Sequence, residues 1–375
     1  MQEVLVIAGE KSGEEHFLSF CDDIITCNPG ISFFGVGGQE MKGQGVECLY
    51  ETSEFSSMGF SEPIKRLPFY FKAMNHLVSE VKRRDVKYAI LIDFQEFNLK
   101  IAEKLTKAGV KVLYYVAPQA WIWREQRCQK LSKYTHRLFS ILPFEKQWFE
   151  DRGVKNIISS QHPVFKRVNE LNLNFDEILD RRKDNPTLLF LPGSRNSEVK
   201  KLLPIYYSVM QELKNRDLGL KFSIVMSDSV SLNIDESFLN EFDSIYSNQD
   251  LNKALISASF CVAASGTVNL ECAFFRVPTI VCYHTSRLNY FVAREIIKYK
   301  GNVSLVNIIL EKEIFPELLQ DKFSKENILN KVLNLINDKE KQNLINQDLV
   351  TLYEKFNDGE NYPGRVMGDL IAKNN

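Results

Sequence analysis

Short apolar runs alternate along the first half of the chain with segments of helical periodicity. One such segment, FNLKIAEKLTKAG, ends at Gly109, a residue type that commonly follows a helix C-terminus. The alternation predicts βαβ units and a parallel sheet, and therefore an α/β fold. The strand-like runs are EVLVIAG (3–9), KYAILID (87–93), VKVLYYVAP (110–118) and RLFSIL (137–142).

A second series of strand-like runs follows the polar stretch NELNLNFDEILDRRKDNP. These runs are TLLFLPG (187–193), LKFSIVMSD (220–228), SFCVAAS (259–265) and VPTIVCYH (277–284). Neither half contains G-x-G-x-x-G, so we expect two Rossmann-like halves around a cleft rather than a dinucleotide enzyme. The expected division is residues 1–168, 186–345 and a polar helical tail, 346–375, that crosses back over the first domain or packs on a neighbouring chain.

Composition fits a globular protein of more than one domain. The chain has 375 residues, of which 44% are hydrophobic and 25% charged, and its net charge is -1. This balance gives no argument for nucleic-acid binding, so any contact with a membrane must come from a local patch. The N-terminus lacks the features of a signal peptide, and no apolar run is long enough to cross a bilayer. We therefore expect a cytoplasmic protein.

The sequence gives little reason to expect a metal site or a disulfide. The seven cysteines include no C-x-x-C, the five histidines show no ligand spacing, and no Asp-x-Asp is present. We expect reduced thiols, no metal and no cofactor.

Two turns in the second half suit a phosphate. In LLFLPGSRNSEVKKLLP a strand ends at Gly193, Ser194 and Arg195, and a helix begins near Ser197. The free N–H groups of that helix and the Arg195 guanidinium favour an anion, although a simple turn with a surface arginine has the same pattern. In AASGTVNLECA the turn Ser265-Gly266-Thr267 precedes a helix that carries Glu271. Glu271 either binds a ribose diol or simply complements the helix dipole.

Carboxylates mark strand ends in the first half. Asp93 ends the run LIDFQEFN and is followed by Glu96 and Asn98. A carboxylate there is well placed as a general base, or alternatively caps the next helix. Ser12 and Gly13, in AGEKSGEEH, either line a cleft or form a plain βα turn. Arg124 follows another strand, and His162 lies near the domain junction.

The segment SSMGFSEPIKRLPFYFKAMNHL interleaves aromatic and basic residues. It predicts either a surface that faces an anionic membrane or an ordinary amphipathic helix packed on the core. The apolar residues expected to face the membrane are Phe60, Ile64, Leu67, Phe69, Tyr70 and Phe71.

Taken together, these motifs resemble the lipid-A-disaccharide synthase family, bacterial glycosyltransferases (family 19) of lipid A and lipopolysaccharide biosynthesis in Gram-negative bacteria. The similarity runs from AGEKSGEEH to about FPELLQ. The matching blocks include GVGGQEM, SSMGFSE, IDFQEFN, YYVAPQAWIWR, LPFEKQWF, HPV, LPGSRNSEVKKLLP, ASGTVNLECA and SLVNIILEKEIFPELLQ.

The resemblance implies a GT-B fold with an amino-terminal lipid-acceptor half and a carboxyl-terminal UDP-sugar half. The implied reaction is the inverting, metal-independent transfer of 2,3-diacylglucosamine from its UDP conjugate to the 6-hydroxyl of 2,3-diacylglucosamine 1-phosphate. It also implies a peripheral location on the inner face of the inner membrane, and a chain end that returns to the first domain or is exchanged within a homodimer.

Residue roles follow from the same resemblance. Asp93 matches the family's essential carboxylate, as base, and Arg195 its essential arginine. Asn307 matches an asparagine important for activity, and Glu271 a nucleotide-facing glutamate. Positions on the cleft or acceptor side are matched by Ser12, Gly13, Met58 and Arg124. The chain departs from the family pattern at Phe94-Gln95-Glu96, Gln161 and Val306.

Two other functions remain open from the sequence. One is another metal-free GT-B enzyme that acts on a UDP-sugar, such as an epimerase, and the other is an inactive lipid-binding module. The aromatic and basic segment argues against the first, and the presence of both Asp93 and Arg195 argues against the second.

Overall fold

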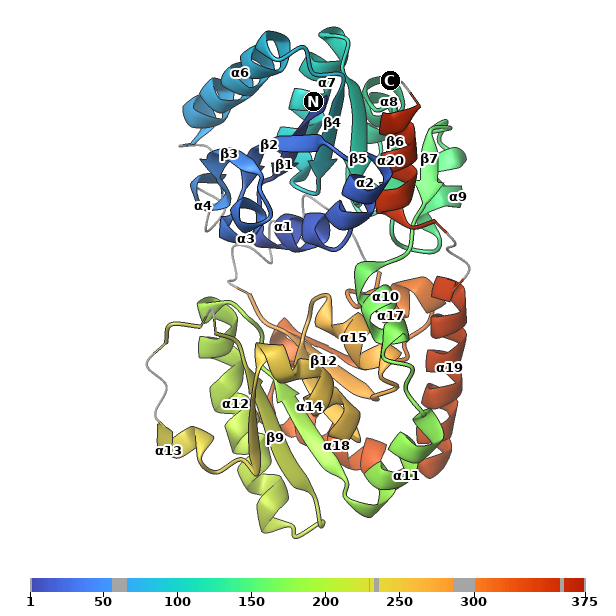
Figure 1. Cartoon of the computed structure of the whole chain (residues 1–375). Coiled ribbons are helices and arrows are strands. Elements are labelled where there is room, and N and C mark those ends of the chain that lie inside the picture. Colours follow the sequence, from blue (N-terminus) through green and yellow to red (C-terminus); the bar gives the residue numbers. More distant parts are fainter. Residues whose placement is uncertain are drawn as a thin grey trace. The chain divides into compact units, whose positions relative to one another are not determined.

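The computed structural model describes residues 2–55, 66–228, 230–232, 236–285, 301–357 and 361–373. The chain divides into two compact units (Figure 1). The first comprises Met1–Pro163 and Asn357–Asn375, and the second comprises Val164–Phe356. Each unit is described separately below.

The first unit is built on a parallel sheet. Among the described residues it has seven strands in the order β3-β2-β1-β4-β5-β6-β7. Its strands are β1 (Gln2–Ala8), β2 (Ile31–Gly37), β3 (Glu47–Glu51), β4 (Tyr88–Ile92), β5 (Lys111–Tyr115), β6 (Arg137–Ser140) and β7 (Ile157–Ser159). Its helices are α1 (Lys11–Leu18), α2 (Cys21–Cys27), α3 (Gln39–Gly43), α4 (Thr52–Phe55), α6 (Leu67–Arg83), α7 (Gln95–Lys107), α8 (Arg127–Tyr134), α9 (Glu145–Glu150) and α20 (Pro363–Ala372).

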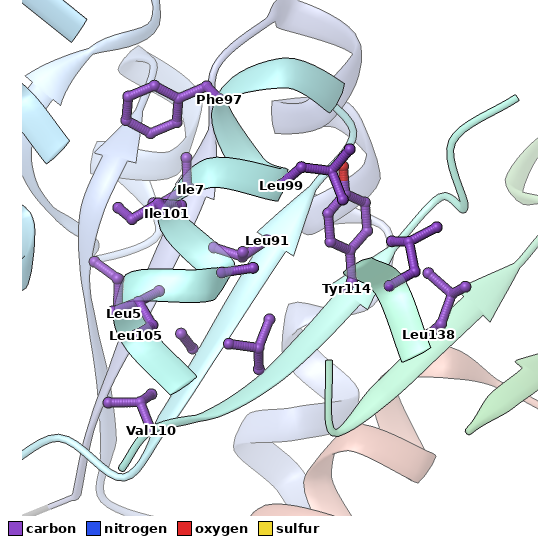
Figure 2. Close-up of a cluster of buried hydrophobic side chains, with 14 of the residues drawn as sticks. Leu5, Ile7, Leu91, Phe97, Leu99, Ile101, Leu105, Val110, Tyr114 and Leu138 are labelled. Atoms are coloured by element: carbon purple, nitrogen blue, oxygen red, sulfur yellow. The ribbon is translucent and has the colours of Figure 1, made fainter. Parts of the chain in front are cut away.

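A continuous apolar core joins α7 to one face of this sheet. Leu5 and Ile7 of β1 and Leu91 of β4 are fully buried there. Figure 2 shows them with side chains of α7 and with Tyr114 of β5. Each fully buried aliphatic side chain contributes about 1.5–3 kcal/mol of transfer free energy. This packing fixes α7 on the sheet, and so fixes the loop between β4 and α7.

The C-terminal end of the chain, from Asn357, belongs to the first unit. Helix α20 packs beside α2 (Figure 1). The Asn28 side-chain amide donates to the carbonyl oxygen of Gly368 at 2.9 Å, and the Tyr88 hydroxyl donates to that of Leu370 at 2.7 Å. Gly364 and Gly368 permit this close approach, since a Cβ on Gly368 would lie 2.7 Å from the Cys27 Cβ. The final helix is therefore an integral part of the first unit.

The second unit repeats the same topology. Its described strands form a six-stranded parallel sheet in the order β10-β9-β8-β11-β12-β13. They are β8 (Thr187–Leu191), β9 (Lys221–Met226), β10 (Ser244–Ser247), β11 (Phe260–Ala264), β12 (Thr279–Tyr283) and β13 (Glu317–Leu319). The helices are α10 (Pro163–Glu170), α11 (Phe175–Asp184), α12 (Asn196–Asn215), α13 (Glu236–Leu239), α14 (Leu251–Ser257), α15 (Val268–Phe274), α17 (Leu305–Leu310), α18 (Lys325–Asn337) and α19 (Lys339–Asn357).

Helix α19 belongs to the second unit for nearly all of its length. Its Phe356 ring lies 5.0 Å from that of Phe274 and 6.0 Å from that of Phe165. Residues 346–356, which the expected division places in the tail, therefore pack with the second unit, and of the described residues after α19 it is α20 that packs in the first. All seven cysteines lie in the described residues and are free. Within the described part of the chain, no helix is both long and apolar enough to span a bilayer.

Replacing Gly364 by alanine is expected to destabilise the docking of α20. The new Cβ would lie 2.6 Å from the Asp23 Cβ and even closer to the Phe20 carbonyl oxygen. Such overpacking costs about 1–3 kcal/mol, which urea denaturation would measure as a lower free energy of unfolding. Gly43→Ala is the control, because a Cβ on Gly43 meets no atom within 4 Å. Equal stability of the two variants would contradict the close packing.

Candidate active site

The candidate residues gather where the strand order of each sheet reverses. In the first unit, β1 lies between β2 and β4, and Glu10 and Asp93 follow β1 and β4. In the second, β8 lies between β9 and β11, and the turns at 193–195 and 265–267 follow β8 and β11. In open parallel sheets, ligands bind beyond the carboxyl ends of the strands at this switch point. Each unit thus carries one half-site in the expected place.

Asp93 occupies a strained turn. Asp93 and Phe94 both have left-handed backbone angles, with φ of 46° and 45°. The Asp93 N–H donates to the Tyr115 carbonyl at 3.0 Å. The Asp93 carbonyl accepts from the Asn98 side-chain amide at 2.6 Å and from the Tyr114 hydroxyl at 3.2 Å. Strain that the surroundings hold in place is characteristic of functional sites.

The surroundings of the Asp93 carboxylate suit a proton acceptor. Burial, and after it the negative charge of Glu10, raises the pKa of Asp93 to about 6. A carboxyl group with this pKa is ionised at neutral pH and is more basic than an ordinary aspartate. Glu10 is exposed. Its effect on the pKa of Asp93 could not be predicted from the sequence, because that effect depends on β1 lying next to β4.

An apolar cavity of about 460 Å³ is lined by Phe94, the residue after Asp93, and by Glu10. Residues of α6 and of the loop and helix after β4 form most of its wall, with charged groups at Glu10, Glu96, Lys100 and Arg124. The apolar lining residues are Leu67, Tyr70, Phe71, Met74, Phe94 and Phe97. An apolar cavity with a few charged groups suits a ligand that has a hydrocarbon part and a polar head.

Phe94, Gln95 and Glu96, at which the chain departs from the family pattern, all line this cavity. The Phe94 ring packs against Phe55, Tyr70 and Phe97. It also lies over Gly9, where a Cβ would come within 2.6 Å of the ring. The three residues therefore shape the cavity rather than disrupt the turn.

Glu96 joins two arginines at the rim of the cavity. Its carboxylate accepts from Arg124 at 2.6 Å and also pairs with Arg127. Arg127 donates in addition to the Gln95 side chain at 2.8 Å. Arg124 has a left-handed φ of 63° and stacks over the Trp123 ring at 3.9 Å. This network holds a guanidinium at the polar end of the cavity.

The loop that carries Arg124 is anchored by a buried carboxylate absent from the sequence prediction. Glu145 accepts from the Trp121 indole N–H at 3.1 Å and from the backbone N–H groups of Ile141 and Leu142. Burial raises the pKa of Glu145 to about 7. Because its partners come from two loops, Glu145 connects the segment after β5 to the start of α9.

Several other described residues predicted on the acceptor side are not among the residues that line this cavity. Asn98 is fully buried and supports the Asp93 turn, and Gly13 is buried where α1 packs on the sheet. Ser12 is exposed after β1, and His162 is 3% exposed. Met58, Phe60 and Ile64 lie outside the described residues.

The predicted membrane-facing segment divides into two groups. Leu67 and Phe71 are 40% and 51% exposed. Phe69 and Tyr70 instead pack into the aromatic cluster around Phe55, and the Tyr70 hydroxyl donates to the Phe55 carbonyl at 2.8 Å. For these two side chains the amphipathic-helix interpretation holds, because the 3.6-residue period turns them toward the core.

Arg195 is exposed at the start of α12 in the second unit. Its guanidinium donates to Glu198 at 2.7 Å, and 77% of its side chain is accessible. An ion pair this exposed contributes little to stability, so Arg195 can exchange Glu198 for an incoming anion. Gly193, with φ of 97°, makes room for Glu198, since a Cβ there would lie 2.6 Å from a Glu198 oxygen.

The neighbouring turn places Ser265, Gly266 and Thr267 at the end of β11. The Ser265 N–H donates to the Cys282 carbonyl at 3.0 Å, while Gly266 and Thr267 are exposed. Ser194 follows Gly193 in the adjacent turn and is also exposed. Glu271, one turn into α15, pairs with Arg167 of α10. The half-site therefore offers an arginine, two small-residue turns and a carboxylate.

Asn307 does not face this half-site directly. It is fully buried, and its amide donates to the Phe315 carbonyl at 2.7 Å and to Glu317 at 2.9 Å. Its oxygen accepts from the N–H groups of Ile314 and Phe315 at 2.8 and 2.9 Å. Both amide hydrogens and both oxygen lone pairs are thus used within the protein, and the contact of Asn307 with the donor stays a prediction.

Comparison with known proteins identifies the family. Residues 4–363 match the family model described as lipid-A-disaccharide synthetase. The chain belongs to this family. A lipid-A-disaccharide synthase of Nitrosococcus oceani is 31% identical over 363 residues, covering 95% of this chain and 92% of the relative. The predicted family and glycosyltransferase activity are confirmed.

Solved structures confirm the GT-B fold class, with a parallel α/β sheet in each unit. The glycotransferase of kitacinnamycin has a TM-score of 0.62 at 11% identity, covering 99% of this chain and 98% of that chain. A UDP-GlcNAc 2-epimerase of Neisseria meningitidis bound to UDP-GlcNAc has a TM-score of 0.56 at 11% identity, covering 100% and 99%. Because both classes share the fold, the family match and not the fold separates transferase from epimerase.

Activity of the enzyme should fall as the pH drops below about 6. The predicted base role requires an ionised Asp93, and because the pKa of Asp93 is raised to about 6, acid would protonate it and remove that role. The acidic limb of the kcat/KM profile measures this pKa. Asp93→Asn should lower kcat by about 10²–10⁴-fold at every pH. An acidic limb near pH 4 would contradict this role.

Glu10→Gln should move that acidic limb to lower pH. Removing the negative charge of Glu10 lowers the pKa of Asp93, because that charge disfavours ionisation of its neighbour. Glu15→Gln is the matched control, since Glu15 is exposed on the following helix. If the acidic limb of the profile moves equally in both variants, or moves in neither, then Glu10 does not act on Asp93.

Proposed function

We propose that this chain transfers 2,3-diacylglucosamine from UDP-2,3-diacylglucosamine to the 6-hydroxyl of 2,3-diacylglucosamine 1-phosphate. The products are the disaccharide 1-phosphate and UDP. The observation that carries the proposal is an apolar cavity, in a chain of this family, whose wall includes Phe94, which follows Asp93, and Glu10, whose charge raises the pKa of Asp93. An acceptor that carries acyl chains needs both a base for its hydroxyl and an apolar surface for its hydrocarbon.

In this mechanism Asp93 removes the proton of the acceptor hydroxyl as the oxygen attacks the anomeric carbon. The bond from that carbon to the UDP oxygen breaks on the opposite face, so the configuration inverts. Arg195 and the N-terminal N–H groups of α12 stabilise the charge that develops on the diphosphate. Glu271 is proposed to hold the ribose, and Ser265, Gly266 and Thr267 to line the nucleotide site.

The cavity supports the lipid character of the acceptor. One acyl chain is proposed to lie among Phe71, Met74 and Phe97, while Lys100 and Arg124 attract the acceptor phosphate. Exposed Leu67 and Phe71 are proposed to touch the inner face of the inner membrane, from which both lipid substrates are drawn. The homodimer implied by the family resemblance stays a prediction.

The test is UDP release by purified protein given UDP-2,3-diacylglucosamine in detergent and EDTA, with and without the acceptor. We expect release that requires the acceptor and survives chelation, with formation of a disaccharide 1-phosphate. Release without acceptor would favour a hydrolase or an epimerase-type enzyme. Absence of release from folded protein that binds the lipid would favour the binding-module alternative.

Arg195→Lys should lower kcat/KM by about 10²–10³-fold, because an ammonium group cannot reproduce the planar fork that grips a diphosphate. Arg181→Lys is the matched control. Arg181 is also exposed and pairs with a glutamate, Glu177, one turn away on α11. Turnover of Arg195→Lys close to that of the control would refute the role assigned to Arg195.

A further inference from the structure

A second cavity lies in the second unit, away from the half-site described above. Its volume is about 510 Å³. Pro186 precedes β8, Phe260 begins β11 and Pro278 precedes β12, and all three line it. They mark the amino ends of the strands, whereas the Arg195 and Ser265 turns follow the carboxyl ends of β8 and β11. The two sites are thus at opposite edges of the same parallel sheet.

The charged side chains that line this cavity are all basic. Arg182, Lys183, Arg276 and Lys339 line it, and no carboxylate is among the described lining residues. Arg182 is committed to the protein, since it donates to four backbone carbonyls at the ends of α14 and α15. Lys183 pairs with Asp180 at 2.8 Å on the exposed face of α11. Arg276 and Lys339 remain to attract a ligand.

Arg276 is held in place with one hydrogen-bond donor unused. It has a left-handed φ of 53°, and its guanidinium lies over the Phe175 ring at 4.2 Å. Its Nε is buried and makes no hydrogen bond, and the same is true of the Asn346 side-chain oxygen. Because these two atoms are closed off from solvent, a ligand in the cavity would meet the other atoms of the Arg276 and Asn346 side chains, which line it.

We propose that this cavity binds a small organic phosphate. Arg276 and Lys339 would pair with the phosphate oxygens. The wall formed by Phe260, Pro278 and Ile336 would contact the carbon skeleton. The volume falls within the range of small-molecule sites, about 300–1,000 Å³. Binding here leaves the donor turns free, because they lie at the other edge of the sheet.

The test is isothermal titration of the full chain with phenyl phosphate and, separately, with inorganic phosphate. Phenyl phosphate should bind more tightly, because only it contacts the apolar wall. Lys339→Ala should weaken its binding about tenfold, the effect of one lost charge-assisted hydrogen bond. Lys355→Ala, an exposed lysine on the same helix α19 outside the cavity lining, should leave it unchanged.

Arg195→Ala separates the two phosphate sites. If phenyl phosphate occupies the proposed cavity, Arg195→Ala binds it as the unaltered chain does. Weakening by Arg195→Ala with no effect of Lys339→Ala would place the phosphate in the donor half-site and overturn the proposal. Absence of binding, or equal affinity for the two phosphates, would overturn it as well. Lys339 is exposed, so its replacement does not disturb the core.

Discussion

The two hydrogen bonds from the Asn98 amide to the carbonyls of Ile92 and Asp93 hold the end of β4 in a conformation it would not otherwise keep. Two successive residues with positive φ cost of order 1–3 kcal/mol each. The buried amide, the Tyr114 hydroxyl and the packing of α7 on the sheet offset that cost. The same turn directs Asp93 toward the strand ends and Phe94 into the cavity wall. The proposed base and the proposed lipid site therefore depend on one constraint.

The two units supply opposite electrostatic properties from the same topology. In the first, burial and the charge of Glu10 make a carboxylate more basic. In the second, an exposed arginine, a helix N-terminus and open turns favour a negatively charged group. A reaction that removes a proton from one substrate and releases a diphosphate from the other needs both properties. Two sheets of the same strand order, with different residues at the switch point, can supply them.

Much of the fold can be predicted from the sequence, because the central strands are continuous apolar runs that neither helices nor loops resemble. The strands β3, β7, β10 and β13 are short and partly exposed, so no apolar run marks them. Asp93 is predictable because it directly follows a buried strand, and Arg195 because it lies in the short turn between a buried strand and a helix. The effect of Glu10 and the burial of Asn98 are not, since both depend on which strands and helices become neighbours.

Asn307 holds the segment that follows α17 through four hydrogen bonds. Its amide closes the turn at 311–317, and Glu317, which it contacts, accepts from the N–H groups of Val303 and Ser304 ahead of α17. Helix α17 packs against α15, the helix that begins at the Ser265 turn and carries Glu271. A change at Asn307 would unpair four hydrogen-bonding groups at once and loosen the support behind that turn. A loss of activity caused in this way would come from weakened structural support. A sequence motif alone cannot distinguish such a supporting residue from one that contacts substrate.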